Sequence, residues 1–284
     1  MKSGEFYRFF IQQLKGIYDA HEASNITSMI FESFAEISRS DIIKDPEIFI
    51  SEDKIEKIKN SLIDLIQHKP VQYVLGEVWF FNLKFIVNEN VLIPRPETEE
   101  LVQEVIHFCK STNQKKIIDI GTGSGCIPVS IKVNIPEADI TAIDIDSKAL
   151  AVAIENAKIN QADIVFLQTD FLNIEERNRL GKYDIIISNP PYIPESEIIK
   201  LDKNVTAFEP YLALFVPDSN PLLFYESIAD FCKNHLVKNG KLFLEVHENL
   251  AKEVCALLEA HQLKAEIKKD IFEKERMVMA THYR

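Results

Sequence analysis

Long apolar runs, paired cysteines and surplus basic residues are all missing from this sequence of 284 residues, and each absence excludes a class of protein. No apolar stretch approaches the roughly 20 residues that cross a bilayer, so we expect no membrane-spanning segment. The first ten residues mix charges with aromatics and do not follow the layout of a secretory signal. The four cysteines are scattered, which predicts free thiols in a reducing cytoplasm.

The charge balance is acidic, with 44 Asp and Glu against 32 Lys and Arg and a net charge of −12. A broad nucleic-acid-binding surface requires an excess of basic residues, so the balance argues against one, although a local basic groove stays open. The seven histidines stand apart without the spacing of metal ligands, and no metal site is predicted. An apolar content of 46% is enough for a globular core.

Glycine is scarce, yet three of the eight glycines lie within the five residues Gly121, Thr122, Gly123, Ser124 and Gly125. The short apolar run before them predicts a buried strand, and the apolar spacing after them predicts a helix. Strand, glycine turn and helix in this order form the nucleotide-binding layout of a doubly wound sheet. No Gly-Lys-Ser/Thr follows the turn, so a P-loop is not expected.

The next two predicted strands also end in residues suited to a ligand. Asp144 follows the strand at 140–143 and has the spacing at which an acidic residue accepts ribose hydroxyls. Asp146 is the alternative for that role, or it caps the helix that starts near residue 147. Phe171 follows the strand at 164–167, and its ring could cover an adenine or belong to the core.

The central stretch is the strand at 183–188, a run of β-branched residues that suits a sheet covered on both faces. It is stopped by Asn189, Pro190, Pro191 and Tyr192, because proline cannot continue a central strand. The Asn189 amide oxygen and the Pro190 carbonyl are two acceptors, and Tyr192 offers a flat face. Together they would hold a planar NH2 group. An ordinary proline turn is the alternative, and the convergence of several strand ends favours the holder.

The chain divides into three parts. Residues 1–70 show helical spacing of apolar side chains and no catalytic cluster, so we expect a helical domain that recognises the substrate. Residues 71–92 are predicted to form a β-hairpin linker, with the turn at Asn82. Residues 93–284 form the ligand-binding α/β domain.

Two further stretches have interpretations that stay open. Arg95 lies between two prolines, just before a predicted helix, and could form a structural salt bridge or contact the ligand. The segment 193–219 is too long for a simple connection, which predicts a lid or a wall of the substrate site.

Four motifs, in this order along the chain, carry a resemblance to a known family. They are Lys69-Pro70-Val71-Gln72-Tyr73-Val74-Leu75-Gly76, Leu92-Ile93-Pro94-Arg95-Pro96-Glu97-Thr98-Glu99, Asp119-Ile120-Gly121-Thr122-Gly123-Ser124-Gly125 and Asn189-Pro190-Pro191-Tyr192-Ile193. Together they resemble the bacterial peptide chain release factor glutamine methyltransferases. The resemblance covers residues 69–284 well, and the stretch from Ile93 to Thr98 is its most specific part.

The resemblance implies a Rossmann-like α/β fold, with a doubly wound, mostly parallel sheet of seven strands that follows a small helical domain and a hairpin bridge. It implies S-adenosylmethionine as cofactor and, as substrate, the glutamine of the Gly-Gly-Gln motif in class 1 release factors, which act in translation termination. The cofactor site would comprise Gly121 to Gly125, Asp144, Phe171 and Asn189. Asn189, Pro190, Pro191 and Tyr192 would hold the substrate amide, with Asn189, Pro190 and Tyr192 in the catalytic role.

Two other functions compete with this interpretation. An adenine N6-methyltransferase acting on DNA or RNA uses the same kind of holder for an exocyclic amine, but it needs a basic channel. An adaptor that binds S-adenosylmethionine without catalysis is disfavoured by the intact stretch from Asn189 to Tyr192.

Overall fold

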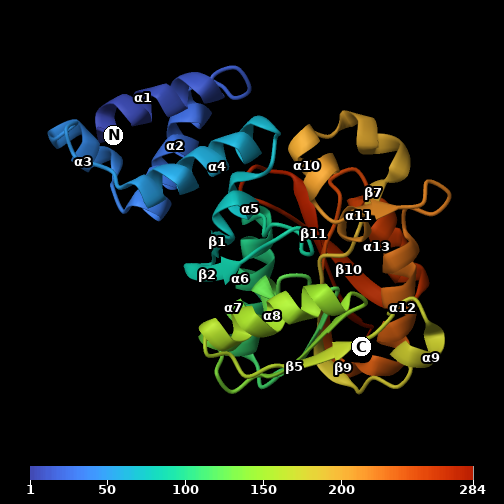
Figure 1. Cartoon of the computed structure of the whole chain (residues 1–284). Helices are drawn as coiled ribbons and strands as arrows, with labels where there is room; N and C mark the ends of the chain where they lie inside the picture. The colour runs from blue at the N-terminus through green and yellow to red at the C-terminus, as the bar shows by residue number, and fades with distance from the viewer. Residues whose placement is uncertain (284) are drawn as a thin grey trace. The chain divides into compact units, whose positions relative to one another are not determined.

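The computed structural model describes residues 1–283 and contains two compact units (Figure 1). We call residues 1–76 together with 202–208 the helical unit, and residues 77–201 together with 209–283 the sheet unit. A short excursion of the chain after residue 201 therefore groups with the N-terminal helices rather than with the sheet.

The helical unit confirms the helical prediction for the N-terminal part of the chain. Its helices are α1 (Ser3–Leu14), α2 (Ala20–Ala35), α3 (Arg39–Lys44), α4 (Glu52–Ile66), α5 (Val71–Leu75) and α10 (Lys203–Phe208). Asp19 caps α2 by accepting the N–H groups of His21 and Glu22. The core of this unit is aromatic, with the Phe31 ring 5.5 Å from Phe6 and 5.9 Å from Phe10.

The prediction that residues 71–92 form one β-rich linker is wrong for its first part. Val71–Leu75 is helix α5, because Pro70 provides a helix-compatible start and Gly76 ends the helix with a left-handed φ of 73°. The hairpin follows, with β1 (Glu77–Phe80) and β2 (Leu83–Ile86) paired antiparallel. Its turn residues Phe81 and Asn82 have positive φ, as a two-residue hairpin turn requires.

A seven-stranded sheet forms the centre of the sheet unit, in the order β10-β11-β9-β6-β3-β4-β5. Its strands are β3 (Lys116–Ile120), β4 (Asp139–Asp144), β5 (Val165–Gln168), β6 (Tyr183–Ser188), β9 (Leu236–Glu245), β10 (Leu263–Lys269) and β11 (Glu275–His282). All neighbours pair parallel except β11, which is antiparallel to β9 and β10. The predicted doubly wound, mostly parallel sheet of seven strands is confirmed.

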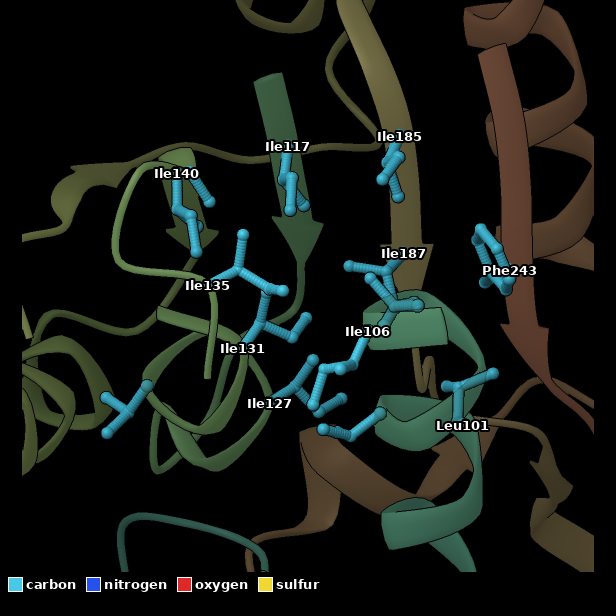
Figure 2. Close-up of a cluster of buried hydrophobic side chains, with 14 of the residues drawn as sticks. Leu101, Ile106, Ile117, Ile127, Ile131, Ile135, Ile140, Ile185, Ile187 and Phe243 are labelled. Carbon is cyan, nitrogen blue, oxygen red and sulfur yellow. The ribbon is translucent and has the colours of Figure 1, made fainter. Parts of the chain in front are cut away.

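Both faces of this sheet are buried, which explains the continuous apolar character of its strands. Ile117, Ile185 and Ile187 point to one face, while Ile118 and Ile186 point to the other. Figure 2 shows the first face, where side chains of α6 and α7, including Leu101, Ile106, Ile127 and Ile131, meet the strand residues.

The helices of the sheet unit are α6 (Pro96–Ser111), α7 (Cys126–Asn134), α8 (Ser147–Ile159), α9 (Ile174–Arg177), α11 (Tyr211–Leu214), α12 (Leu223–His235) and α13 (Ala251–Ala260). Pro96 is the first residue of α6, and Pro128 lies in the first turn of α7, two positions where the missing N–H costs little.

The winding of the chain reverses between β3 and β6. From β3 the chain moves outward to β4 and β5, and then returns to place β6 on the other side of β3. The loops that leave the carboxyl ends of β3 and β6 therefore diverge, and the crevice between them is where open α/β sheets bind ligands.

The segment 193–219 contains short structured pieces rather than one open loop. These are β7 (Ile193–Pro194), the 3-10 helix η1 (Glu195–Lys200), α10, α11 and β8 (Phe215–Val216), with β7 and β8 paired parallel. Pro210, Leu212 and Ala213 reach the ligand pocket described below, so the segment contributes to the wall of that pocket.

Candidate active site

A pocket of about 230 Å³ lies within the sheet unit, at the carboxyl ends of the central strands. Four strand ends contribute to it, as the sequence predicted: the glycine turn after β3, Asp144 after β4, Phe171 after β5 and Asn189 after β6. The stretch before α6 adds Pro94, Arg95 and Thr98. Segments that are far apart in sequence therefore converge on one pocket.

The glycine turn has a backbone that other residues adopt rarely. Gly121, Gly123 and Gly125 have φ of 74°, 53° and 76°. At Gly121 and Gly123 a Cβ would meet no atom within 4 Å, so the turn leaves open space on the pocket side. At Gly125 a Cβ would lie 3.0 Å from the Cβ of Ala153, so this glycine lets the turn pack closely on α8.

Asp144 holds the glycine turn in place. Its carboxylate accepts the N–H of Gly123 at 2.8 Å and the N–H of Asp146 at 3.0 Å. Burial raises the pKa of Asp144, and these two hydrogen bonds act against that rise. Each carboxylate oxygen keeps a second lone pair, so the group can still accept hydroxyl donors from the pocket.

Asp146 has a different local role. Its side chain accepts the N–H of Lys148 at 2.8 Å and caps α8, which is the alternative that the sequence left open for it. The residue also lines the pocket, so it caps the helix and borders the site.

Phe171 lies at the boundary between pocket and core. Its ring is 5.4 Å from the Phe231 ring in an edge-to-face arrangement, and the guanidinium of Arg177 lies over it at 5.7 Å. The residue therefore belongs to the core and also lines the pocket. A ring fixed by such neighbours is a rigid surface for a flat ligand.

Asn189 takes part in a buried chain of hydrogen bonds. Its Nδ2 donates to Oγ1 of Thr98 at 3.3 Å, and the Thr98 hydroxyl donates to Oε2 of Glu245 at 2.6 Å. Glu245 is 3% exposed, and burial raises its pKa to about 7, against the opposing effect of the Thr98 hydrogen bond.

The three residues after Asn189 separate into two groups. Pro190 and Pro191 line the pocket with Asn189. Tyr192 does not line it: its ring packs against the second core cluster and lies 5.9 Å from the ring of His247. The structure therefore places the Asn189 amide and the two prolines together at the pocket, whereas Tyr192 packs on the core side of the loop.

Arg95 forms a salt bridge, one of the two roles that the sequence left open. Its Nη2 donates to Oε1 of Glu209 at 2.6 Å, and the Glu209 side chain is only 2% exposed. The other carboxylate oxygen of Glu209 accepts the N–H of Ile93 at 3.4 Å. The pair joins the stretch before α6 to the 193–219 segment, and Arg95 still borders the pocket.

Sequence reasoning missed three polar residues around the site. Thr98 belongs to one of the sequence motifs but has no predicted role, and Glu245 is not predicted to belong to the site. Asn156, fully buried on α8, donates to the carbonyls of Ser124 and Ile86, and so ties the glycine turn to β2. The available signal for Glu245 is a single carboxylate within the apolar run from Leu242 to Val246, whereas Asn156 follows Glu155 and carries no such signal.

Within residues 1–283, no group of His, Cys, Asp and Glu side chains could hold a metal ion, and no helix is long and apolar enough to cross a membrane. The pocket's donors and acceptors instead fit a nucleoside ligand. The pocket has open space beside Gly121 and Gly123, the Asp144 carboxylate with lone pairs that remain free, and the ring of Phe171, which its neighbours hold in place.

Comparison with known proteins agrees with this geometry. The family model "Methyltransferase small domain" matches residues 99–205. A release factor glutamine methyltransferase from Flavobacterium psychrophilum is 43% identical over 273 residues, which are 95% of each chain. One from Bacteroides thetaiotaomicron is 36% identical over 95% of this chain and 96% of its own, and one from Streptococcus pneumoniae is 36% identical over 98% of both.

Fold, pocket and family model together define a methyltransferase that depends on S-adenosylmethionine. The relatives narrow this class further. The chain belongs to the release factor glutamine methyltransferase family.

Proposed function

We propose that this protein transfers a methyl group from S-adenosylmethionine to the side-chain nitrogen (N5) of a glutamine, in the Gly-Gly-Gln motif of class 1 peptide chain release factors. The observation that supports it most is the position of Asn189 in a nucleoside-type pocket, in a chain 43% identical to a release factor glutamine methyltransferase. An amide at this position is suited to hold another amide.

On the cofactor side, Gly121 to Gly125, Asp144, Phe171 and Asn189 would bind S-adenosylmethionine. Asp144 would accept the ribose hydroxyls with its remaining lone pairs. Phe171 would contact the adenine with a ring that Phe231 and Arg177 already fix. When bound, the cofactor supplies an electrophilic methyl group on a sulfonium.

On the substrate side, the task of the protein is orientation. The lone pair of a glutamine amide nitrogen is delocalised into its carbonyl, so the nitrogen is a poor nucleophile. Oδ1 of Asn189 and the carbonyl of Pro190 would accept the two amide hydrogens, while Pro191 borders the site and Tyr192 supports the loop. Alignment of this kind can contribute about 7–11 kcal/mol to lowering a barrier in favourable cases.

The rival substrate, an adenine in DNA or RNA, is less favoured. The family relatives carry the name of a protein-directed enzyme, and the net charge of −12 disfavours a long nucleic-acid footprint. The same acceptor pair could hold an adenine amine, so nucleic acid belongs in the test as a competing substrate.

The domain assignment remains part of the proposal. Residues 1–70 would recognise the protein substrate, and residues 93–284 would carry the methyltransferase activity. Residues 71–92 would connect these two domains. Every residue that lines the pocket lies at position 90 or later, and the helical unit exposes large apolar side chains such as Ile43 and Phe49. Substrate binding by the first domain fits both facts.

A cytoplasmic location is also part of the proposal. All four cysteines are free thiols, and Cys109, Cys126 and Cys232 are buried. Free thiols fit a reducing compartment such as the cytoplasm, where release factors act in translation.

The test is transfer of a radiolabelled methyl group to three substrates: a class 1 release factor, the same factor with the Gly-Gly-Gln glutamine changed to alanine, and DNA. Label on the first alone, located by mass spectrometry on that glutamine, is the expected result. Label on DNA, or label that survives the glutamine change, would contradict the proposal.

A further inference from the structure

Asn189 is connected to a buried carboxylate through one hydroxyl group. Thr98 lies in the first turn of α6, where its backbone N–H donates to the carbonyl of Arg95 at 3.1 Å. Its hydroxyl joins Asn189 Nδ2, at 3.3 Å, to Glu245 Oε2, at 2.6 Å. Glu245 ends β9, and its own backbone carbonyl accepts the hydroxyl of the buried Tyr225 at 3.1 Å.

Counting hydrogens determines the direction of this chain. An ionised Glu245 has no hydrogen to give, so the only hydroxyl hydrogen of Thr98 must point to it. Oγ1 of Thr98 can then only accept from Asn189. The Asn189 atom that faces Thr98 must therefore be the donor Nδ2, and the acceptor Oδ1 must face the other way.

This orientation matters because a terminal amide can rotate by half a turn at little intrinsic cost. A rotated Asn189 would present its NH2 group to the incoming NH2 group of the substrate, and two donors repel. Asn189 by itself does not favour the orientation in which Oδ1 points away from Thr98, so its neighbours must determine that orientation.

We propose that Thr98 and Glu245 are positioning residues, which hold the Asn189 carboxamide with Oδ1 directed toward the substrate amide. The inference rests on the proposed function, because it assigns the substrate's NH2 group to Asn189. Thr98 acts through Asn189, and Glu245 acts through Thr98 and through its own side-chain hydrogen bond with Asn189.

We call the hydrogen-bonded chain from Glu245 through Thr98 to Asn189 the relay, and the ionisation of Glu245 controls it. A protonated Glu245 can donate to Thr98, and the Thr98 hydroxyl can then donate to Oδ1 of Asn189 and stabilise the rotated amide. Since burial raises the pKa of Glu245 to about 7, the correct orientation weakens as pH falls through neutrality. The charged and titratable groups that influence Glu245 or border it are Glu97 on α6, Cys126 on α7, Tyr192 after β6, Tyr225 on α12 and Arg276 on β11.

The experiment compares Thr98→Val, which keeps the shape and removes the hydroxyl, with Thr98→Ser, which keeps the hydroxyl. Methyl transfer to the release factor is measured with the full-length protein, together with cofactor affinity by calorimetry and the melting temperature. Thr98→Val should lower kcat about tenfold or more with unchanged cofactor affinity. Thr98→Ser should retain most of the parental kcat. Tyr225→Phe removes a neighbouring buried hydrogen bond but not the relay, so its kcat should remain close to that of the parent.

A second measurement is independent of the folding of Thr98→Val. The pH profile of kcat should have an acidic limb near pH 7 in the parent protein, and Glu245→Gln should remove that limb. A parental kcat in Thr98→Val, or an unchanged acidic limb in Glu245→Gln, overturns the relay. Failure of the parent protein to label any release factor overturns the proposed function instead, and the two failures are thus separable.

Discussion

The carboxylate of Asp144 accepts the backbone N–H of Gly123 at 2.8 Å, across 21 residues of chain. One side chain therefore fixes the glycine turn and also offers acceptors to the pocket. Loss of Asp144 should consequently affect ligand binding in two ways, through loss of the proposed ribose contacts and through a less ordered turn.

We predict that Asp144→Ala weakens the binding of S-adenosylmethionine by about 1.5–3 kcal/mol, as expected when a charged hydrogen-bonding group is lost. Calorimetry measures this directly. The matched control is Asp146→Ala, which removes the cap of α8 and should cost about 1 kcal/mol of stability with little change in affinity. An unchanged affinity in Asp144→Ala and a weakened one in Asp146→Ala would reverse the two assignments.

Asn189→Ala should separate chemistry from cofactor binding. The carboxamide is assigned to the substrate nitrogen, so its loss should lower kcat about a hundredfold or more while cofactor affinity is largely retained. Single-turnover methyl transfer and calorimetry on the same sample test this. Near-parental turnover in this variant would rule out the amide-holder mechanism.

The Arg95–Glu209 pair gives a prediction about the 193–219 segment. Arg95→Ala leaves the Glu209 carboxylate buried without its cation, which is costly for a group only 2% exposed. We expect faster hydrogen exchange in α11 and β8, which follow Glu209, and a lower melting temperature. Glu209→Gln keeps a hydrogen-bonding partner for Ile93 N–H and should show a smaller effect on both. Equal exchange rates in all three proteins would show that the pair does not order the segment.

The sheet and most of the pocket could be predicted because the relevant signals are local. Glycines at 121, 123 and 125 and the prolines at 190 and 191 interrupt apolar strands, and each interruption marks a strand end. In a parallel sheet such ends lie on one edge, so the convergence follows from the winding rule.

The relay through Thr98 could not be predicted in the same way. Thr98 and Glu245 are 147 residues apart, and neither neighbourhood carries a pattern that pairs them. Their contact follows from how the start of α6 lies over the end of β9, which is a tertiary relationship.

The β prediction is wrong at residues 71–75 for a local reason. Five residues are too few to separate a strand period from a helical turn, and the ends decided the outcome. Pro70 and the left-handed Gly76 favour a short helix.

The proposed role of the helical unit predicts an effect on substrate affinity alone. Ile43 and Phe49 are 73% and 75% exposed, so changing either to serine should not destabilise the fold. We expect KM for the intact release factor to rise several-fold, while kcat and cofactor affinity stay close to the parent values. Ile154→Ser, at a 52% exposed position on α8, is the control. Unchanged KM in both helical-unit variants would leave this surface without a part in recognition.

Buried carboxyl groups lead to a prediction about stability and pH. Burial raises the pKa of both Asp119 and Glu245 to about 7, from ordinary values of 3.8 and 4.5. Between those ordinary values and 7 the folded protein binds more protons than the unfolded chain. Their contribution to the free energy of unfolding is therefore complete below the ordinary values and is lost as the pH rises through 7.

These two groups should therefore make the protein less stable as the pH rises from about 4 to about 7. Carboxyl groups with a lowered pKa, such as Asp41 and Glu248, have the opposite sign but act below their ordinary values, outside this window. Asp119→Asn keeps the shape and removes the charge, so it should flatten the curve and raise the melting temperature at pH 8. Asp139→Asn, at an exposed position on β4, should leave the slope as it is. A parental slope in Asp119→Asn would show that Asp119 does not titrate in this range.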